Sequence, residues 1–305
     1  MRRSARQAGM TLAELMVALA VGLGIVLAAG RLLVLANGAY AAQMESAVID
    51  DGGRFAIDLI GRAVRQAGAA DPDAVATATD AAPARVAGLD ARSLSRATPG
   101  IADPLSAAVN GSDVLAVRFP GAGPAPDGDG SAVDCAGFSI AAGEEGWSIF
   151  YVARNGEGEA ELRCKYRGNT HWGADALVAG VDGFQVLYGV DTDDPPDGVA
   201  NRYLNAAGVD VLDAGLAGLG AAEFNRRTHW KRVVGVRVAL LLHGGRPTRA
   251  AAGTARYDLF GAGYADAVGA DDPGSSLDEA RMPPDLRRRE RRLFTVTVAL
   301  PVPPS

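Results

Sequence analysis

The sequence contains few of the residues on which enzymatic and metal chemistry depend. Its 305 residues include 2 cysteines and 3 histidines, and their spacing matches neither a zinc site, a CxxC redox motif nor an HExxH helix. No GxSxG, P-loop or paired-carboxylate motif occurs. We therefore expect a non-catalytic protein. The histidines are His171, His229 and His243, and we assign them no metal or acid–base role. The first two precede tryptophans, which indicates that they lie at half-buried loop ends.

Positive charge is also scarce. The formal net charge is −6, and because Arg2, Arg3 and Arg6 contribute +3, the rest of the chain carries −9. Nucleic-acid binding needs dense Lys and Arg to displace counterions from phosphates, so we do not expect a nucleic-acid partner. Aromatic residues make up only 6% of the chain, whereas there are 39 glycines and 16 prolines, which indicates a large share of loop.

One long apolar run stands near the start of the sequence. Residues 15–30 carry no charge, and the apolar character continues from Leu32 to Ala36, beyond Arg31. At about 1.5 Å per helical residue, this length nearly crosses a hydrocarbon core of about 30 Å. It predicts a transmembrane helix rather than a buried core helix. Because arginines before such a run remain cytoplasmic, the larger part of the chain should lie on the far side of the membrane.

The segment that opens this run carries a family resemblance. Gly9-Met10-Thr11-Leu12-Ala13-Glu14-Leu15 resembles the class III signal of type IV prepilins and pseudopilins. The resemblance implies that prepilin peptidase cuts between Gly9 and Met10, and that Met10 becomes the N-methylated first residue. It also implies that Glu14 pairs with the N-terminal amine of a neighbouring subunit, since a carboxylate at the edge of hydrocarbon is costly alone. The chain departs from the family at Met10, usually phenylalanine, and at Ala13, usually bulkier.

Beyond the membrane run, apolar residues recur at steps of three and four, which predicts that the helix continues as an amphipathic spine. We expect it to end near Gly68, with Asp71-Pro72 as the stop. The chain is thereby divided into a leader (1–9), a membrane half (10–36) and an amphipathic half (37–68) of the helix, and a globular domain (69–305). Gly52-Gly53 predict either local melting or a close helix contact. The expected apolar face comprises Phe55, Leu59, Ile60, Ala63, Val64 and Ala67.

The remainder of the sequence predicts strands. Residues 72–111 lack a clear period and indicate loops with short strands, whereas apolar residues alternate after them. A helix followed by strands indicates an α+β fold, in which an antiparallel sheet packs on the apolar face of the long N-terminal helix. The expected strand faces are Leu115, Val117 and Phe119; Trp147, Ile149 and Tyr151; Leu162, Cys164 and Tyr166; Phe184, Val186 and Tyr188; Val234, Val236, Val238, Leu240 and Leu242; and Phe294, Val296, Val298 and Leu300.

Several short segments together resemble the PilW-type minor pilins. The resemblance implies a type IV pilin-like fold and a minor pilin that takes part in the priming and assembly of type IV pili, with the filament tip as one position. The end of the chain departs from the family, which often closes on Arg-Asn, because here the last strand runs into Leu300-Pro301. The segments are Gly53–Ala56, Arg65–Gly68, Asp134–Gly137, Leu162–Cys164, Val181–Gly189 and Val236–Leu241.

The resemblance also implies partners and a location. The partners are other minor pilins, the major pilin, prepilin peptidase, the inner-membrane assembly platform and a tip adhesin. The chain would cross the inner membrane once, with its C-terminal domain in the periplasm, and then enter the pilus at the cell surface. Two other functions stay open: a minor pseudopilin of a type II secretion system, and a membrane-anchored periplasmic binding or sensory domain.

A periplasmic location favours a disulfide between Cys135 and Cys164, because paired cysteines persist as disulfides in that oxidising compartment. We expect a structural disulfide between them. In the chain-entropy model, it would stabilise the fold by about 3–4 kcal/mol.

Two charged clusters are interpreted as surface features. Asp191, Asp193 and Asp197 alternate before Gly198 and resemble the start of a calcium loop, but two prolines and the missing glutamate depart from that pattern. We interpret them as a solvated acidic turn, with calcium as the sole cofactor candidate. The basic run Arg287–Arg292 predicts a solvated stretch that keeps the apolar final strand from aggregating, or a contact with an acidic neighbouring pilin or with DNA. The acidic remainder of the chain favours the protein partner.

Overall fold

The computed structural model describes residues 10–67 and 82–300. The leader with Gly9, the expected helix stop at Gly68 and Asp71-Pro72, and the segment from Pro301 onward lie outside the described residues. Within them, a long helix is followed by antiparallel sheets, which confirms the predicted α+β fold.

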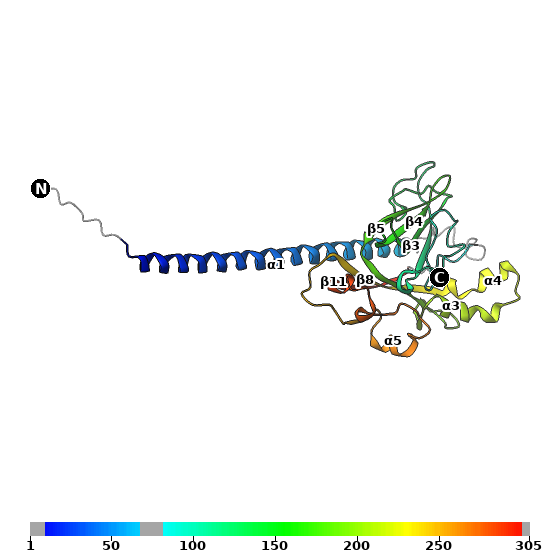
Figure 1. Ribbon diagram of the computed structural model, residues 1–305. Coiled ribbons are helices and arrows are strands. Elements are labelled where there is room, and N and C mark those ends of the chain that lie inside the picture. Colours follow the sequence, from blue (N-terminus) through cyan, green and yellow to red (C-terminus); the bar gives the residue numbers. More distant parts are fainter. Residues whose placement is uncertain (1–9, 68–81, 301–305) are drawn as a thin grey trace.

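Helix α1, Leu12–Ala67, is a single helix of 56 residues that projects from the domain as a rod (Figure 1). Residues 10–40 are exposed throughout. Among the described residues, α1 is the one helix that is long and apolar enough to cross a membrane. Its C-terminal third passes between two sheets, so one helix carries both the exposed apolar half and part of the core of the domain (Figure 1).

The buried stripe of α1 differs from the predicted apolar face at one position. Ile60 and Val64 are buried as predicted, but Phe55 is 48% exposed. The stripe runs through Gly53 and Ala56 instead, and Phe55 lies one residue, about 100°, away from it. The prediction for Phe55 was therefore wrong, because the sheet leaves room for small side chains at this turn.

The glycine pair in α1 is a close helix contact. A Cβ on Gly53 would lie 2.2 Å from the ring of Phe294, and one on Gly52 would lie 3.2 Å from Val178 Cγ1. The helix is unbroken through both residues. Of the two predicted alternatives, the structure has the close contact.

The domain has two main antiparallel sheets joined around α1. The first has the order β1-β2-β3-β4-β5, the second has the order β11-β8-β6-β7, and a small third sheet pairs β9 with β10. In the described part of the chain, three short α-helices, α3, α4 and α5, lie outside the sheets (Figure 1). The strands are β1 Val86–Leu89, β2 Val114–Pro120, β3 Glu145–Arg154, β4 Ala160–Arg167, β5 Trp172–Ala179, β6 Val181–Val190, β7 Arg202–Leu204, β8 Val233–Pro247, β9 Arg256–Asp258, β10 Ser276–Asp278 and β11 Arg289–Ala299, and the helices are α3 Ala206–Leu212, α4 Ala221–Arg227 and α5 Ala262–Val268, with 3₁₀ turns η1 Val109–Gly111, η2 Asp213–Leu216, η3 His229–Arg232, η4 Glu279–Arg281 and η5 Leu286–Arg288.

Gly180 is the corner at which the chain passes from the first sheet into the second. Its N–H donates to Ala160 O at 2.9 Å, and its carbonyl accepts from His243 N at 2.7 Å, so β4 and β8 lie on opposite sides of it. Its φ is +78°, and a Cβ would lie 2.4 Å from His243 O. Only glycine fits this corner without strain.

The core between the sheets confirms most predicted strand faces and corrects two. In β4, β6 and β11, the predicted residues face α1. In β3, however, Phe150 and Val152 face α1, whereas Ile149 and Tyr151 pack in a second cluster with Leu94 on the outer face. In β8, Val233 replaces Val234 in the core, because the pairing with β6 shifts by one residue between Gly189 and Val190.

Candidate functional site

The start of α1 holds the predicted docking acid in a defined geometry. Glu14 Oε2 accepts hydrogen bonds from Thr11 N at 2.8 Å and Thr11 Oγ1 at 3.0 Å, and Glu14 N donates to Thr11 Oγ1 at 3.3 Å. This is the reciprocal Thr-x-x-Glu capping box, in which each residue satisfies a backbone N–H of the other. The box is visible in the sequence at residues 11–14 and was missed there.

The face of α1 that carries Glu14 is lined by small side chains. Ala18 and Gly22 follow Glu14 at four-residue steps and leave a shallow hollow on the helix surface. Small residues at this spacing let another helix backbone approach closely in a membrane. The acid therefore lies beside a surface suited to helix packing.

Further along α1, a second apolar stripe faces away from the sheets. Tyr40, Met44, Val48 and Phe55 are 66%, 49%, 63% and 48% exposed. Their spacing of four, four and seven places them on one face. Val48 and Phe55 on this face lie about 100° around the helix from the buried residues Ile49 and Ala56. Exposed apolar area of this kind marks a contact surface for another protein or a membrane.

The predicted disulfide between Cys135 and Cys164 is confirmed. The S–S distance is 1.97 Å, the Cα atoms are 5.8 Å apart, and both residues are buried. The bond ties the segment between β2 and β3 to strand β4.

The structure brings the three carboxylates of the acidic turn together. Their oxygens lie within 4.8 Å of one another, with Asp191 buried and Asp193 and Asp197 exposed. Asp191 accepts from the backbone of Asp193 at 3.0 Å and of Gly198 at 2.7 Å. Asp193 Oδ2 accepts from the side chain of Asn201 at 3.0 Å. The carboxylates thus already hold the turn through hydrogen bonds within the chain.

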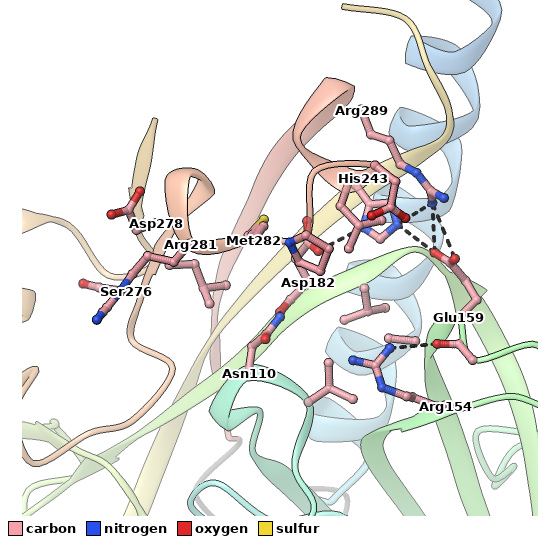
Figure 2. A pocket seen from close by; sticks show the side chains of 18 of the residues that line it. Asn110, Arg154, Glu159, Asp182, His243, Ser276, Asp278, Arg281, Met282 and Arg289 are labelled. Atoms are coloured by element: carbon pink, nitrogen blue, oxygen red, sulfur yellow. Dashed lines mark hydrogen bonds and ion pairs between the residues drawn. The ribbon is translucent and has the colours of Figure 1, made fainter. Parts of the chain in front are cut away.

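A cleft of about 830 Å³ opens beside the Gly180 corner (Figure 2). One wall is the turn between β3 and β4, with Arg154 and Glu159, and the other is the segment from β9 to β11, with Arg281 and Met282. Asp182 and His243 come from β6 and β8 between the walls (Figure 2). The cleft has the size of a small-molecule or peptide site.

The basic run Arg287–Arg292 spans the end of η5 and the start of β11, and it is only partly solvated: Arg288 is exposed, most of the run is half-buried and Arg291 is buried. The prediction of a solvated guard or partner contact therefore does not hold for Arg291. Arg291 has a fully buried side chain that contacts Asp182 Oδ2 at 2.6 Å and Glu279 Oε1 at 3.1 Å. Arg292 pairs with Asp50 of α1. Ionisable side chains contact one another across the corner in a continuous chain, which consists of Arg249, Glu279, Arg291, Asp182, His243, Glu159 and Arg289.

The histidines occupy three different environments. His171 is exposed, contrary to its prediction as a half-buried loop end, and its Nδ1 lies 2.8 Å from Thr170 Oγ1. His229 is half-buried as predicted, with Nδ1 2.7 Å from Asp213 Oδ1. His243 has a side chain that is 3% exposed, between Glu159 and Asp182. His243 follows the core residue Leu242 in β8, so the alternation of side chains along the strand is the signal that could have placed it on the face away from the core.

A buried lysine was also missed in the sequence. Lys165 is 0% exposed, and its ammonium donates to Ser95 O at 2.9 Å and Gly100 O at 2.7 Å. Burial lowers its pKa to about 8. It follows the core residue Cys164 in β4, so alternation alone places it on the other face, under the 93–105 loop.

The family comparison agrees with this geometry. A membrane-length helix that continues into an antiparallel domain defines a pilin-like subunit. The chain belongs to the PilW family, because the family model described as Type IV Pilus-assembly protein W matches residues 149–301, half of the chain. The protein therefore belongs to the machinery of type IV pilus assembly.

A solved structure similar to the chain is the type IV-like pilin TTHA1219 from Thermus thermophilus. The identity is 15%, and the alignment covers 71% of this chain and 84% of that chain with a TM-score of 0.33. Because this structural similarity is low, the family assignment depends on the family model alone. The search of curated proteins gave no match.

Proposed function

We propose that this protein is a minor pilin, a structural and non-catalytic subunit that helps to prime type IV pilus assembly. The observation that carries the proposal is α1: an exposed apolar half with a capped acid at its start continues into a half held by the PilW-family domain. A helix of this kind suits lateral packing in a bundle of like helices. A domain fixed rigidly to it would present its surfaces at a defined height on the filament.

The first step of the proposed mechanism is cleavage between Gly9 and Met10 by prepilin peptidase, followed by N-methylation of Met10. Glu14 then pairs with the N-terminal amine of a neighbouring subunit. In a low-dielectric bundle each of these charges is costly alone and strongly stabilised by the other. The capping box supports this step, because it already orients the Glu14 carboxylate toward the helix start.

The orientation follows from charge. Arg2, Arg3 and Arg6 hold the leader on the cytoplasmic side of the inner membrane, so the domain folds in the periplasm, where the Cys135–Cys164 disulfide is stable. Its partners there are other minor pilins, the major pilin, the assembly platform and a tip adhesin.

Deletion of the gene followed by complementation tests the proposal. We expect the deletion to abolish surface pili and twitching motility, and the wild-type gene to restore both. Glu14→Ala should fail to restore them while remaining in the membrane. Asp51→Ala, which removes an exposed acid of the same helix outside the membrane half, should restore them fully.

Other outcomes would identify another function. Normal pili with failed exoprotein secretion would indicate a pseudopilin of a type II secretion system. Normal pili and normal secretion would indicate a membrane-anchored binding or sensory domain. Immunogold labelling of sheared filaments would place the protein, with label at filament ends expected for a tip position and label along the length contradicting it.

A further inference from the structure

Arg31 is a charged residue inside the apolar half of α1, the part that projects from the domain as a rod (Figure 1). It is exposed, and a Cβ on the preceding Gly30 would meet nothing within 4 Å. The nearest charged residues of the helix are Glu14 and Glu45. At about 1.5 Å per residue, they lie about 25 Å and about 21 Å away along the helix axis. Arg31 therefore has no carboxylate partner on its own helix.

The helical turns on either side of Arg31 are apolar. Side chains three and four positions away are its neighbours on a helix surface. These neighbours are Leu27, Ala28, Val34 and Leu35. The three large ones are 59%, 71% and 69% exposed. A guanidinium remains charged and is costly among hydrocarbon groups, so its partner has to come from the surroundings of the helix.

The position of Arg31 along the apolar run places it near one surface of the bilayer. Residues 15–30, which carry no charge, span about 24 Å, against a hydrocarbon core of about 30 Å. From this depth a long arginine side chain reaches the headgroup layer, where phosphates are the anions at hand. A guanidinium binds a phosphate through two parallel N–H···O bonds. This step rests on the membrane-spanning placement of α1 in the proposed function.

Arg31 also lies off the surface that suits helix packing. It follows Glu14 by 17 residues, which places it about 100° around the helix from that acid. It is therefore outside the hollow that Glu14, Ala18 and Gly22 line. A neighbouring helix packed on that hollow leaves Arg31 beside lipid.

We propose that Arg31 binds the phosphate of a phospholipid headgroup in the leaflet next to the domain, and that this contact sets the depth of α1 in the membrane. With the guanidinium at the level of the phosphates, the uncharged span that crosses the hydrocarbon is residues 15–30, shorter than the core by about 6 Å. A helix that is too short is accommodated by local thinning of the bilayer at a modest cost. The contact thus holds residues 32–36 at the headgroup layer, although they are apolar.

Depth measurements by electron paramagnetic resonance test this site in the full chain, with one copy in each phospholipid nanodisc. Because both native cysteines form the disulfide, a cysteine introduced by Ala36→Cys takes up the only spin label. Its accessibility to oxygen and to a water-soluble nickel complex reports its depth. We expect the label to lie in the headgroup layer with Arg31 present. With Arg31→Leu it should lie deeper by at least about 3 Å, or two residue rises. Equal depth in both chains would overturn the proposal.

Two further variants assign the shift to the charge at this position. Arg31→Lys keeps a positive charge and should keep the label in the headgroup layer. Arg54→Leu is the matched control, because Arg54 is an exposed arginine of the same helix outside the membrane half, and it should leave the depth unchanged. A shift with Arg54→Leu as large as with Arg31→Leu would contradict a site at Arg31.

The lipid identifies the partner. In nanodiscs of digalactosyldiacylglycerol, whose headgroup has no phosphate, the shift caused by Arg31→Leu should largely disappear. A shift as large as in phospholipid would show that the guanidinium seeks water rather than phosphate, and it would overturn the phosphate site. A shift that appears only with two chains in each disc would indicate a carboxylate of a neighbouring subunit and would overturn it as well.

A label in the middle of the apolar run separates this inference from the proposed function. With Leu23→Cys, the label should be accessible to oxygen and shielded from the nickel complex. A label exposed to water there would contradict both the membrane-spanning placement of α1 and the site at Arg31. A shielded label at Leu23→Cys, together with no effect of Arg31→Leu at Ala36→Cys, would contradict the phosphate site alone.

Discussion

Single buried side chains govern how this domain responds to its surroundings. Lys165 has no carboxylate partner in its hydrogen bonds and is held by carbonyl groups of the 93–105 loop. The acidic turn shows the opposite case, in which carboxylates of a surface turn, the buried Asp191 and the exposed Asp197, accept hydrogen bonds from backbone N–H groups close in sequence. The first arrangement costs free energy through desolvation, whereas the second stabilises a local turn.

Replacement of Lys165 should remove a pH dependence. The pKa in the folded state is about 8 against an ordinary 10.5, so the unfolded chain binds more protons between these values and the free energy of unfolding should rise with pH there. We expect a rise in Tm from pH 8 to pH 10 in the native protein. Lys165→Met should lack that rise, whereas Lys231→Met, at the other lysine of the chain, should keep it.

Calcium should leave the acidic turn unchanged. Because hydrogen bonds within the chain already fix Asp191 and Asp193, we expect millimolar calcium to shift the Tm of the full chain by no more than magnesium does. A calcium-specific rise that disappears in Asp193→Asn would instead make residues 191–198 a calcium site, the alternative that the sequence left open.

Among the secondary-structure elements, the contact between α1 and β11 joins the long apolar helix to the domain. Phe294 fits against Gly53, and Arg292 pairs with Asp50 one turn earlier. The small residue in the helix lets an aromatic ring approach the backbone. The helix is thereby fixed both along its axis and around it.

Gly53→Ala should weaken the contact between α1 and β11. The new methyl group would lie 2.2 Å from the Phe294 ring, and relief of such overpacking costs about 1–3 kcal/mol. Thermal unfolding of the full chain should show a lower Tm. Gly38→Ala is the control, because nothing lies within 4 Å of its Cβ position, and it should be neutral or stabilise by up to about 1 kcal/mol. An unchanged Tm in Gly53→Ala would mean that Phe294 has room to turn away.

The sequence predicted these elements unevenly, for physical reasons. Periodicity identified α1, β6 and β11, because each has one face against a large core. Periodicity did not show which face of β3 packs against α1. Both Phe150 and Ile149 are buried, so apolar residues occupy both faces of the strand and their alternation does not distinguish the two. Helices α3 and α4, of seven residues each, are too short for a helical period to appear. The charge chain was missed because Arg291 and Asp182 are 109 positions apart.

The whole domain should be more stable in mild acid than at neutral pH. Burial raises the pKa of Asp113 well above its ordinary value of 3.8, and Asp90 and Asp272 are raised from 3.8 by burial as well. For these groups the folded state binds more protons than the unfolded state, so the free energy of unfolding falls as the pH rises above about 4 through the folded pKa values.

Thermal melts of the full chain between about pH 5 and pH 7.5 measure this dependence. We expect a steady fall in Tm across the range, and a shallower fall in Asp272→Asn, whose amide oxygen can accept from Asn205 and whose NH2 group can donate to the Tyr264 hydroxyl. A Tm that stays level or rises across this range would contradict the raised pKa values of these aspartates.

The contact between α1 and β11 also determines when the subunit is completely folded. Gly53 belongs to the first described element of the chain and Phe294 to the last strand, so during synthesis the helix is made long before the side chain that holds it. Contacts between such distant segments form late in folding. Until β11 has folded onto the helix, the helix is not coupled to a finished domain. A chain stalled or clipped before its last strand would lack a rigid spine, and this timing gives assembly a physical basis for passing over unfinished subunits.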